Sequence, residues 1–220
     1  MTLDFERDGA AHLAGAAAPF LAELRALAAA LPAGKAGLRL HGIESLAELL
    51  APDALGAAAA HRLGMAAQPV RAIWFDKSAA NNWALGWHQD RTTAVQQRAE
   101  VPGYGPWSTK QGLLHVEPPF SVLESMVTLR IHLDPVPEDN APLLVAPGSQ
   151  RLGKIPEAGI AATVKACGAA TCLAEAGDVW AYQTPILHAS AASLADGHRR
   201  VLQVDYSTLD LPAPLAWLGI

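Results

Sequence analysis

Two histidines and one aspartate in this chain have the residue types and the spacing of a non-haem iron site. His88 and Asp90 stand two residues apart within Trp-His-Gln-Asp at positions 87–90. On a β-strand, residues two apart leave the same face, so both side chains can bind one metal ion. A third ligand, His188, would complete a facial triad of two histidines and one carboxylate. This triad leaves coordination positions open and is typical of iron(II) oxygenases rather than of closed structural zinc sites.

Two other histidine–carboxylate pairs have similar spacing and are alternatives to this assignment. His132 and Asp134 end the segment 125–134, whose alternating apolar residues predict one continuous strand followed by a turn. We therefore interpret His132 as a hydrogen-bonded histidine of that strand. His115 and Glu117 lie in a stretch with little periodicity, which predicts a loop or a strand end that walls the pocket or contacts the substrate.

Five short blocks follow one another along the chain between about residues 69 and 208. They are NNWALGWHQD at 81–90, DNAPLLVAPGS at 139–149, GDV at 177–179, HAS at 188–190 and RR at 199–200. In type and order these blocks resemble the phytanoyl-CoA dioxygenase family of iron(II)/2-oxoglutarate oxygenases. Two departures are visible, since Ala141 stands where the family usually has glycine and Gln150 where it usually has histidine. Both lie in a turn between strands, so they bear on loop geometry rather than on the ligands.

The resemblance implies roles for individual residues. Arg199 would bind the distal carboxylate of 2-oxoglutarate, because its planar guanidinium grips a carboxylate with two parallel hydrogen bonds and keeps its charge. Ser190 would donate a further hydrogen bond to that carboxylate, and Gln89 would lie near the co-substrate. The iron ligands that the resemblance implies are His88, Asp90 and His188.

Arg200 is the alternative to Arg199 for binding the co-substrate. The two arginines leave opposite faces of the strand predicted over residues 199–206, and Arg200 shares the more apolar face. A rule that turns the apolar face inward would select Arg200. We expect Arg199, because the catalytic end of such a barrel is polar inside and the N-terminal helices can cover the other face.

Helical patterns come first in this chain and strand patterns follow. Apolar residues at helical spacing between Leu13 and Leu31 predict an amphipathic helix, with shorter helices over about residues 44–51 and 53–64. From Val70 to about residue 208 the period changes to two, which indicates strands separated by turns. The sequence thus favours a mainly β chain with N-terminal helices, in the α+β class.

The resemblance implies that the strands form a double-stranded β-helix, a kind of jelly roll, with the metal at its open end. We expect one domain over residues 1–220, divided into a helical N-terminal cap over 1–66 and a jelly-roll catalytic core over 67–210.

Residues 94–121 form the longest segment without clear periodicity and begin just after the proximal ligands. Loops of that length are usually functional or disordered, and the aromatic residues of this one predict an ordered lid. Trp83, Trp87 and Trp107 are candidates for the wall of the substrate pocket, with core packing as the alternative for the first two. The basic residues that could pair with an acidic substrate are Arg91, Arg98 and Lys110.

Charge and hydropathy narrow the class of partner. The net charge of the 220 residues is −5 and there is no basic run, so we expect no nucleic acid partner. No apolar stretch approaches the length of a membrane span, and the acidic start is unlike a secretory signal, so we expect a cytoplasmic protein. The expected partners are a small-molecule substrate and dioxygen.

The resemblance implies an iron(II)/2-oxoglutarate-dependent dioxygenase that hydroxylates a small molecule and releases succinate and carbon dioxide. Its cofactors would be iron(II) and 2-oxoglutarate, with ascorbate as an accessory reductant. Asp90 keeps the metal carboxylate that halogenating relatives lack, which favours hydroxylation over halogenation. Two alternatives remain: a non-catalytic jelly-roll protein that senses or binds a metal or a small acid, and a metal enzyme that does not use 2-oxoglutarate.

Overall fold

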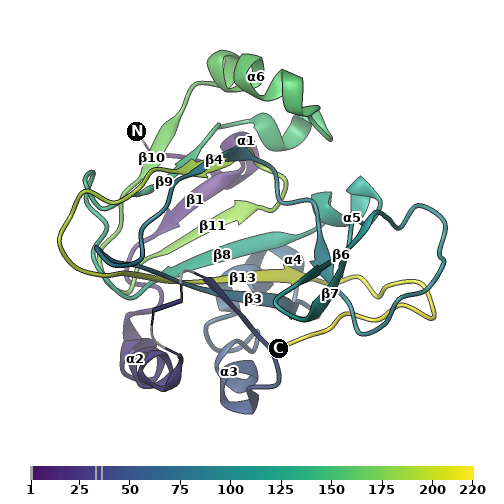
Figure 1. Cartoon of the computed structure of the whole chain (residues 1–220), viewed down its shortest axis with the longest axis horizontal. Helices are drawn as coiled ribbons and strands as arrows, with labels where there is room; N and C mark the ends of the chain where they lie inside the picture. The colour runs from purple at the N-terminus through teal and green to yellow at the C-terminus, as the bar shows by residue number, and fades with distance from the viewer. Residues whose placement is uncertain (1, 33, 36) are drawn as a thin grey trace.

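The computed structural model describes residues 2–32, 34–35 and 37–220. Its strands pair antiparallel, and the two larger of its three sheets lie one above the other (Figure 1). The larger sheet has the order β1 (Ala10–Leu13), β11 (Val179–Gln183), β8 (Val127–His132), β13 (Arg199–Ser207), β3 (Gln68–Lys77) and β2 (Gly37–Leu40). The smaller sheet has the order β10 (Ala170–Cys172), β9 (Leu143–Val145), β12 (His188–Ser190) and β4 (Leu85–His88).

Helices cover the outer faces of both sheets (Figure 1). On the larger sheet these are α2 (Leu21–Ala30), α3 (Glu44–Leu49) and α4 (Ala57–Leu63), whose apolar residues join one core with the sheet. On the smaller sheet, α6 (Ile160–Cys167) packs against Trp87 and Leu187. The remaining helical segments are α1 (Phe5–Asp8), α5 (Phe120–Glu124) and the 3-10 turns Ala18–Phe20, Ser149–Leu152 and Glu157–Gly159.

Alternation along the central strands divides the larger sheet into an apolar outer face and a polar inner face. In β8, Leu129 and Ile131 join the core under the helices, whereas Thr128 and Arg130 make polar contacts on the inner face. In β13, residues 202, 204 and 206 join the same helical core. The strand predicted over residues 125–134 is confirmed as β8, and the helices supply the cover that was expected for the apolar face of β13.

The N-terminal part, expected as a helical cap over residues 1–66, contains two strands besides its helices. Its strands β1 and β2 form the two edges of the larger sheet, paired with β11 and β3. The helix predicted from Leu13 begins only at Leu21, because Leu13 ends β1 and Gly15 then turns the chain with φ 64°. The two shorter predicted helices are observed as α3 and α4.

The segment 94–121 is an ordered part of the fold. It contains most of a third sheet with the order β5 (Thr93–Ala94), β7 (Leu113–Val116) and β6 (Trp107–Lys110), and it ends in α5. Lys110 at the end of β6 donates a hydrogen bond to Thr92, at 2.7 Å. Within the described part of the chain, no helix combines the length and the apolar character needed to cross a membrane.

Candidate metal centre

The smaller sheet brings together the two histidines that lie far apart in the sequence. His188 begins β12 and His88 ends β4, and the antiparallel pairing of these strands makes the two residues direct partners. Their ring centroids lie 4.2 Å apart. Asp90 follows just beyond the end of β4, and one ligand atom from each of the three residues lies within 4.8 Å of the others. Among the described residues, no other group of three such side chains meets this criterion.

Backbone carbonyls fix the orientation of both imidazole rings. Nδ1 of His88 lies 2.8 Å from the carbonyl oxygen of Gly86, and Nδ1 of His188 lies 3.0 Å from that of Ile186. When each Nδ1–H donates to its carbonyl, each Nε2 presents a lone pair to the space between the rings. Burial and the neighbouring His88 lower the pKa of His188 to about 4, so its imidazole is neutral at pH 7.

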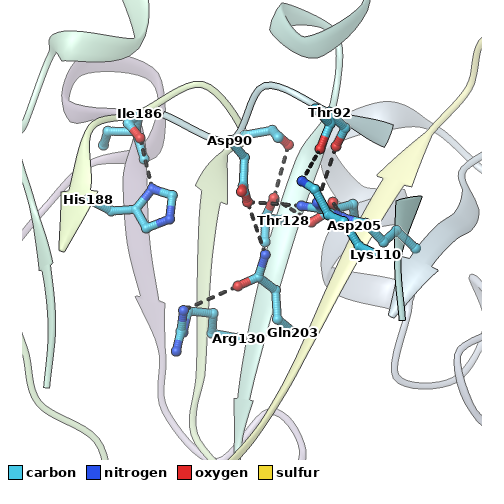
Figure 2. A network of polar contacts seen from close by, with 11 residues as sticks. Asp90, Thr92, Lys110, Thr128, Arg130, Ile186, His188, Gln203 and Asp205 are labelled. Carbon is cyan, nitrogen blue, oxygen red and sulfur yellow. Dashed lines mark hydrogen bonds and ion pairs between the residues drawn. The ribbon is translucent and has the colours of Figure 1, made fainter. Parts of the chain in front are cut away.

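The carboxylate of Asp90 is held through one of its two oxygens. Oδ2 accepts hydrogen bonds from Nη2 of Arg71 at 2.9 Å and from Nε2 of Gln203 at 3.1 Å. Figure 2 shows Gln203 reaching Asp90 from the inner face of the larger sheet, with His188 on the other side of the carboxylate. Burial alone would raise the pKa of Asp90, but the Arg71 charge and the two histidines hold it well below its usual value. Asp90 is therefore ionised, and Oδ1 is the oxygen left for a metal.

Arg71 is itself fixed by a buried polar network. Its Nε donates to Oδ2 of Asp205 at 2.5 Å, and its Nη1 donates to the carbonyl oxygen of Thr92 at 3.1 Å. The other oxygen of Asp205 accepts from the hydroxyl of Thr128 at 2.9 Å. These contacts fix the orientation of the Arg71 guanidinium. Because Arg71 in turn donates to Asp90, the larger sheet sets the position of the Asp90 carboxylate.

We expect Gln203→Leu to weaken iron(II) binding about tenfold or more, because loss of a group that orients a metal ligand typically has an effect of this size. The measurement is anaerobic competition with a coloured iron(II) chelator. Gln97→Leu is the matched control, since Gln97 is an exposed glutamine whose side chain donates to the carbonyl of Pro214. An unchanged affinity in Gln203→Leu would show that the hydrogen bond to Asp90 is dispensable.

A cavity between the two sheets adjoins the metal-ligand cluster through His188. Its lining carries three cationic side chains, Lys77, Arg130 and Arg199, and none of the described residues that line it is acidic. The other lining residues are Phe75, Trp83, Leu85, Leu143, Ala189 and Ser190. A buried surface with this charge is suited to an anionic ligand.

The structure separates the two adjacent arginines. Arg199 is 1% exposed, lines the cavity and donates from Nη1 to the carbonyl oxygen of Ala141 at 2.7 Å. Arg200 leaves the opposite face and pairs with both carboxylate oxygens of Asp134, at 2.8 and 2.5 Å. Burial and the charge of Arg130 lower the pKa of Arg199 to about 9, which still leaves it protonated at pH 7. Only Arg199 is placed to meet a ligand beside His188.

Ala141 provides a carbonyl that both Arg199 and Ser190 contact. The Ser190 hydroxyl donates to this carbonyl at 3.1 Å, and the backbone of Ala141 is left-handed, with φ 48°. A residue with a side chain pays a steric penalty of about 1–2 kcal/mol in this region, which glycine avoids. Ala141 therefore adopts a left-handed conformation that glycine would adopt without this penalty, and the stability of the turn is lower as a result.

Three of the predicted pocket and co-substrate residues contact other parts of the fold. The amide of Gln89 is buried and holds the 153–155 loop, because Nε2 donates to Gly153 and Pro185 and Oε1 accepts from the backbone N–H of Ile155. Alternation points Gln89 away from the metal side, and its amide is engaged with this loop, so a position near the co-substrate stays a prediction. Trp87 packs under α6, and Trp107 belongs to the third sheet; of the three candidate tryptophans, only Trp83 lines the cavity.

The two rival histidines are not part of the metal-ligand cluster. His132 lies in β8 as predicted, but neither ring nitrogen has a hydrogen-bond partner among the described residues, so the expected hydrogen bonding is wrong. Burial lowers its pKa to about 3, which keeps the ring neutral. His115 lies in β7 of the third sheet, and its Nδ1 contacts the carbonyl of Leu113.

The basic residues proposed to meet an acidic substrate also have other partners. Arg91 donates to the carbonyl of Ile155, and Lys110 donates to Thr92. Arg98 is exposed and lies near Glu100. The cations that face the cavity, Lys77 and Arg130, were not among the predicted site residues, although both belong to the inward face that strand alternation assigns to Arg199.

Residues 5–201 match the sequence model of a family described as phytanoyl-CoA dioxygenase (PhyH). The chain belongs to this family. Membership places it in the iron(II)/2-oxoglutarate-dependent oxygenase superfamily, as the sequence blocks predicted. Among curated proteins, none matches the chain by sequence.

Solved structures of the superfamily have the same fold. EctD from S. alaskensis, solved with 2-oxoglutarate and 5-hydroxyectoine, is 19% identical with a TM-score of 0.67, covering 98% of this chain and 77% of its own. The epimerase SnoN, solved with Fe3+, alpha ketoglutarate and nogalamycin RO, is 18% identical with a TM-score of 0.64, covering 98% and 84%. HygX from Streptomyces hygroscopicus, solved with nickel, 2-oxoglutarate and hygromycin B, is 13% identical with a TM-score of 0.62, covering 92% and 84%. The mainly β, double-stranded β-helix fold with N-terminal helices is thereby confirmed.

Proposed function

We propose that this protein is an iron(II)/2-oxoglutarate-dependent dioxygenase that hydroxylates a small molecule, with iron bound by His88, Asp90 and His188. The observation that carries the proposal is the position of this triad beside a cavity, which it adjoins through His188. The cavity contains Arg199, and none of the described residues that line it is acidic. A metal site beside a buried cationic cavity suits a co-substrate that chelates the metal at one end and carries a carboxylate at the other.

The donor set of the triad fits iron(II). Two imidazoles with their Nε2 atoms free and one carboxylate with a single free oxygen give three ligands on one side of the metal. The set contains no thiolate and is not the closed four-ligand shell of structural zinc. Three coordination positions stay available for a chelating co-substrate and for dioxygen.

The cavity supplies the groups that a 2-oxoglutarate carboxylate needs. Arg199 provides a charged fork and Ser190 a hydroxyl, and both now donate to the Ala141 carbonyl, so a carboxylate entering here replaces that acceptor. The cavity in this structure is narrow, about 20 Å³. Admission of a diacid therefore requires outward movement of its outer wall, which is formed by the half-buried Trp83 and the exposed Leu85.

Bound iron(II) would supply the oxidising chemistry, in which dioxygen and 2-oxoglutarate yield succinate, carbon dioxide and one oxygen atom for the substrate. The protein holds the ligands in place through the Gly86 and Ile186 carbonyls and through Arg71 and Gln203. The hydrogen bonds to Oδ2 of Asp90 would leave Oδ1 as the oxygen that holds iron(II).

The test of this function is iron(II)-dependent conversion of 2-oxoglutarate to succinate by the purified protein, with ascorbate present. We expect slow succinate formation without substrate, and faster formation with an extract of small molecules that contains the substrate. A non-catalytic jelly-roll protein would bind 2-oxoglutarate or metal without forming succinate. A metal enzyme of another kind would turn over the extract without needing 2-oxoglutarate.

We expect the substrate to gain one oxygen atom, drawn from dioxygen, rather than a halogen. Asp90 would take the position that a halide needs on the metal, and two hydrogen bonds fix its carboxylate. The measurement is mass spectrometry of the product formed in labelled dioxygen and in the presence of chloride. A chlorinated product from the unaltered protein would contradict this reading. An epimerised or desaturated product would show oxidation of a C–H bond without hydroxylation.

A further inference from the structure

Lys77 is a buried cation that the proposed function does not yet use. It lies at the end of β3, is 1% exposed and lines the same cavity as Arg199. Its ammonium group donates to the hydroxyl of Ser190 at 3.0 Å and to the carbonyl of Ala191 at 2.6 Å, and it lies 4.9 Å from the centre of the Trp83 ring. None of these partners carries a negative charge.

The sheet places Lys77 directly opposite Arg199. The two residues are partners in the antiparallel pairing of β3 with β13, so their side chains leave the same face of the sheet. Like charges in this relation destabilise a sheet, and the effect is larger where water is excluded. When both side chains are protonated, two such groups weaken the folded state unless an anion binds between them, because both are 1% exposed and none of the described residues that line the cavity is acidic.

The pKa of Lys77 agrees with this. Burial lowers its pKa to about 7, and the charges of Arg199 and Arg130 contribute to the shift. The other titratable group that lines the cavity is His188, whose ring is neutral at pH 7. An anion bound between Lys77 and Arg199 reverses the unfavourable environment and stabilises the protonated amine.

Ser190 connects the two cations. Its hydroxyl accepts from Lys77 and donates to the Ala141 carbonyl, which also accepts from Arg199. A carboxylate that displaces this carbonyl from Arg199 therefore arrives beside Ser190 and within reach of the Lys77 ammonium. We propose that Lys77 is a second cationic contact for the distal carboxylate of 2-oxoglutarate, so that this carboxylate is bound between Lys77 and Arg199.

This inference rests on the proposed function, because it takes 2-oxoglutarate as the ligand. It adds a residue that determines which oxo acid the cavity accepts. With two cations around one end, the cavity discriminates strongly between a dicarboxylate and an oxo acid that ends in a methyl group, since the latter would leave both charges buried without a partner.

The experiment compares 2-oxoglutarate with 2-oxopentanoate, which has the same keto acid but a methyl group in place of the distal carboxylate. Binding of each to the anaerobic iron(II)-loaded protein is followed by the metal-to-ligand charge-transfer absorption. We expect Lys77→Met to weaken 2-oxoglutarate binding about tenfold or more, the usual effect of losing a hydrogen bond to a charged group, and to change 2-oxopentanoate binding less than about twofold. Lys77→Gln keeps a donor for the Ala191 carbonyl and should show the same selective loss if Lys77→Met does not fold.

Lys165→Met is the matched control, because Lys165 is an exposed lysine on α6, away from the cavity lining, and should leave both affinities unchanged. Unchanged 2-oxoglutarate binding in both Lys77 variants, or equal weakening of the two oxo acids, would overturn the role of Lys77. Failure of the unaltered protein to bind 2-oxoglutarate would instead overturn the proposed function, and this inference with it.

Discussion

Replacing His188 with alanine should abolish iron-dependent conversion of 2-oxoglutarate to succinate and weaken iron(II) binding by more than about 100-fold. Loss of a group that only orients a ligand has an effect of about 10–100-fold, and loss of the ligand itself exceeds it. His188 is 4% exposed and its Nδ1 is engaged with the Ile186 carbonyl, so Nε2 is the ring nitrogen available to a metal. Iron content after anaerobic loading and succinate formation are the two measurements.

His132→Ala is the control for the effect of removing a buried histidine. His132 lies on the inner face of β8, is fully buried like His188, and is not part of the metal-ligand cluster. Its ring has no hydrogen-bond partner among the described residues, so its removal mainly leaves a cavity. Iron binding that is lost in His132→Ala and kept in His188→Ala, with both variants folded by circular dichroism, would refute the assignment.

Arg199→Ala should weaken 2-oxoglutarate binding by roughly 30-fold or more, which corresponds to about 2–5 kcal/mol for the loss of one partner of a buried, charged pair. The arginine is buried in the cavity beside His188, where solvent screens its charge little. The measurement is titration of 2-oxoglutarate into the anaerobic iron(II) complex, with iron affinity determined separately.

Arg200→Ala is the control for Arg199→Ala, because it removes the same charge from a position outside the cavity. Arg200 is the adjacent arginine, but it points to the opposite face and pairs with Asp134. We expect some loss of thermal stability and little change in 2-oxoglutarate affinity. A larger loss of affinity in Arg200→Ala than in Arg199→Ala would show that the wrong face of β13 had been assigned to the cavity.

The central strands of the larger sheet could be predicted from the sequence because apolar and polar residues alternate along them. The two edge strands of this sheet could not be predicted. β8 alternates over its whole length and β13 does so from residue 202 onward, which predicts both strands. The inward face of β13 was predicted from the polar interior expected at the catalytic end of the barrel. β1 and β2 are four residues long and contain no β-branched or aromatic residue, so local propensity does not favour a strand. Pairing with β11 and β3 stabilises these strands, and a single sequence does not reveal such long-range pairing.

The metal ligands and the rest of the site differ in how far the sequence specifies them. The short spacing of His88 and Asp90, together with the family resemblance, selects the residues that the structure brings within 4.8 Å of one another. Arg71, Gln203 and Lys77 were missed, because one charged or polar residue in a strand usually indicates a solvent-facing side chain. A signal for these residues exists only when three strands are considered together. β3, β8 and β13 each carry polar residues on one face, and the adjacency of the strands shows that these faces line one interior.

Closeness in sequence to the candidate metal ligands did not predict which tryptophans line the cavity. Trp87 is adjacent to a candidate metal ligand, but alternation places it on the other face of β4, under α6. Trp107 belongs to the segment 94–121, whose β6–β7 hairpin packs into a separate apolar cluster. Trp83 reaches the cavity because the connection between β3 and β4 carries it over the opening beside Lys77.

The central claim is that His88, Asp90 and His188 bind iron beside a 2-oxoglutarate site. The most direct measurement is anomalous diffraction at the iron absorption edge, from crystals grown without oxygen in the presence of iron(II) and 2-oxoglutarate. We predict one strong anomalous peak at bonding distance from Nε2 of both histidines and from a single oxygen of Asp90, with the co-substrate extending to Arg199. A peak beside His132 or His115, or no peak between His88 and His188 in a well-ordered crystal, would contradict the assignment.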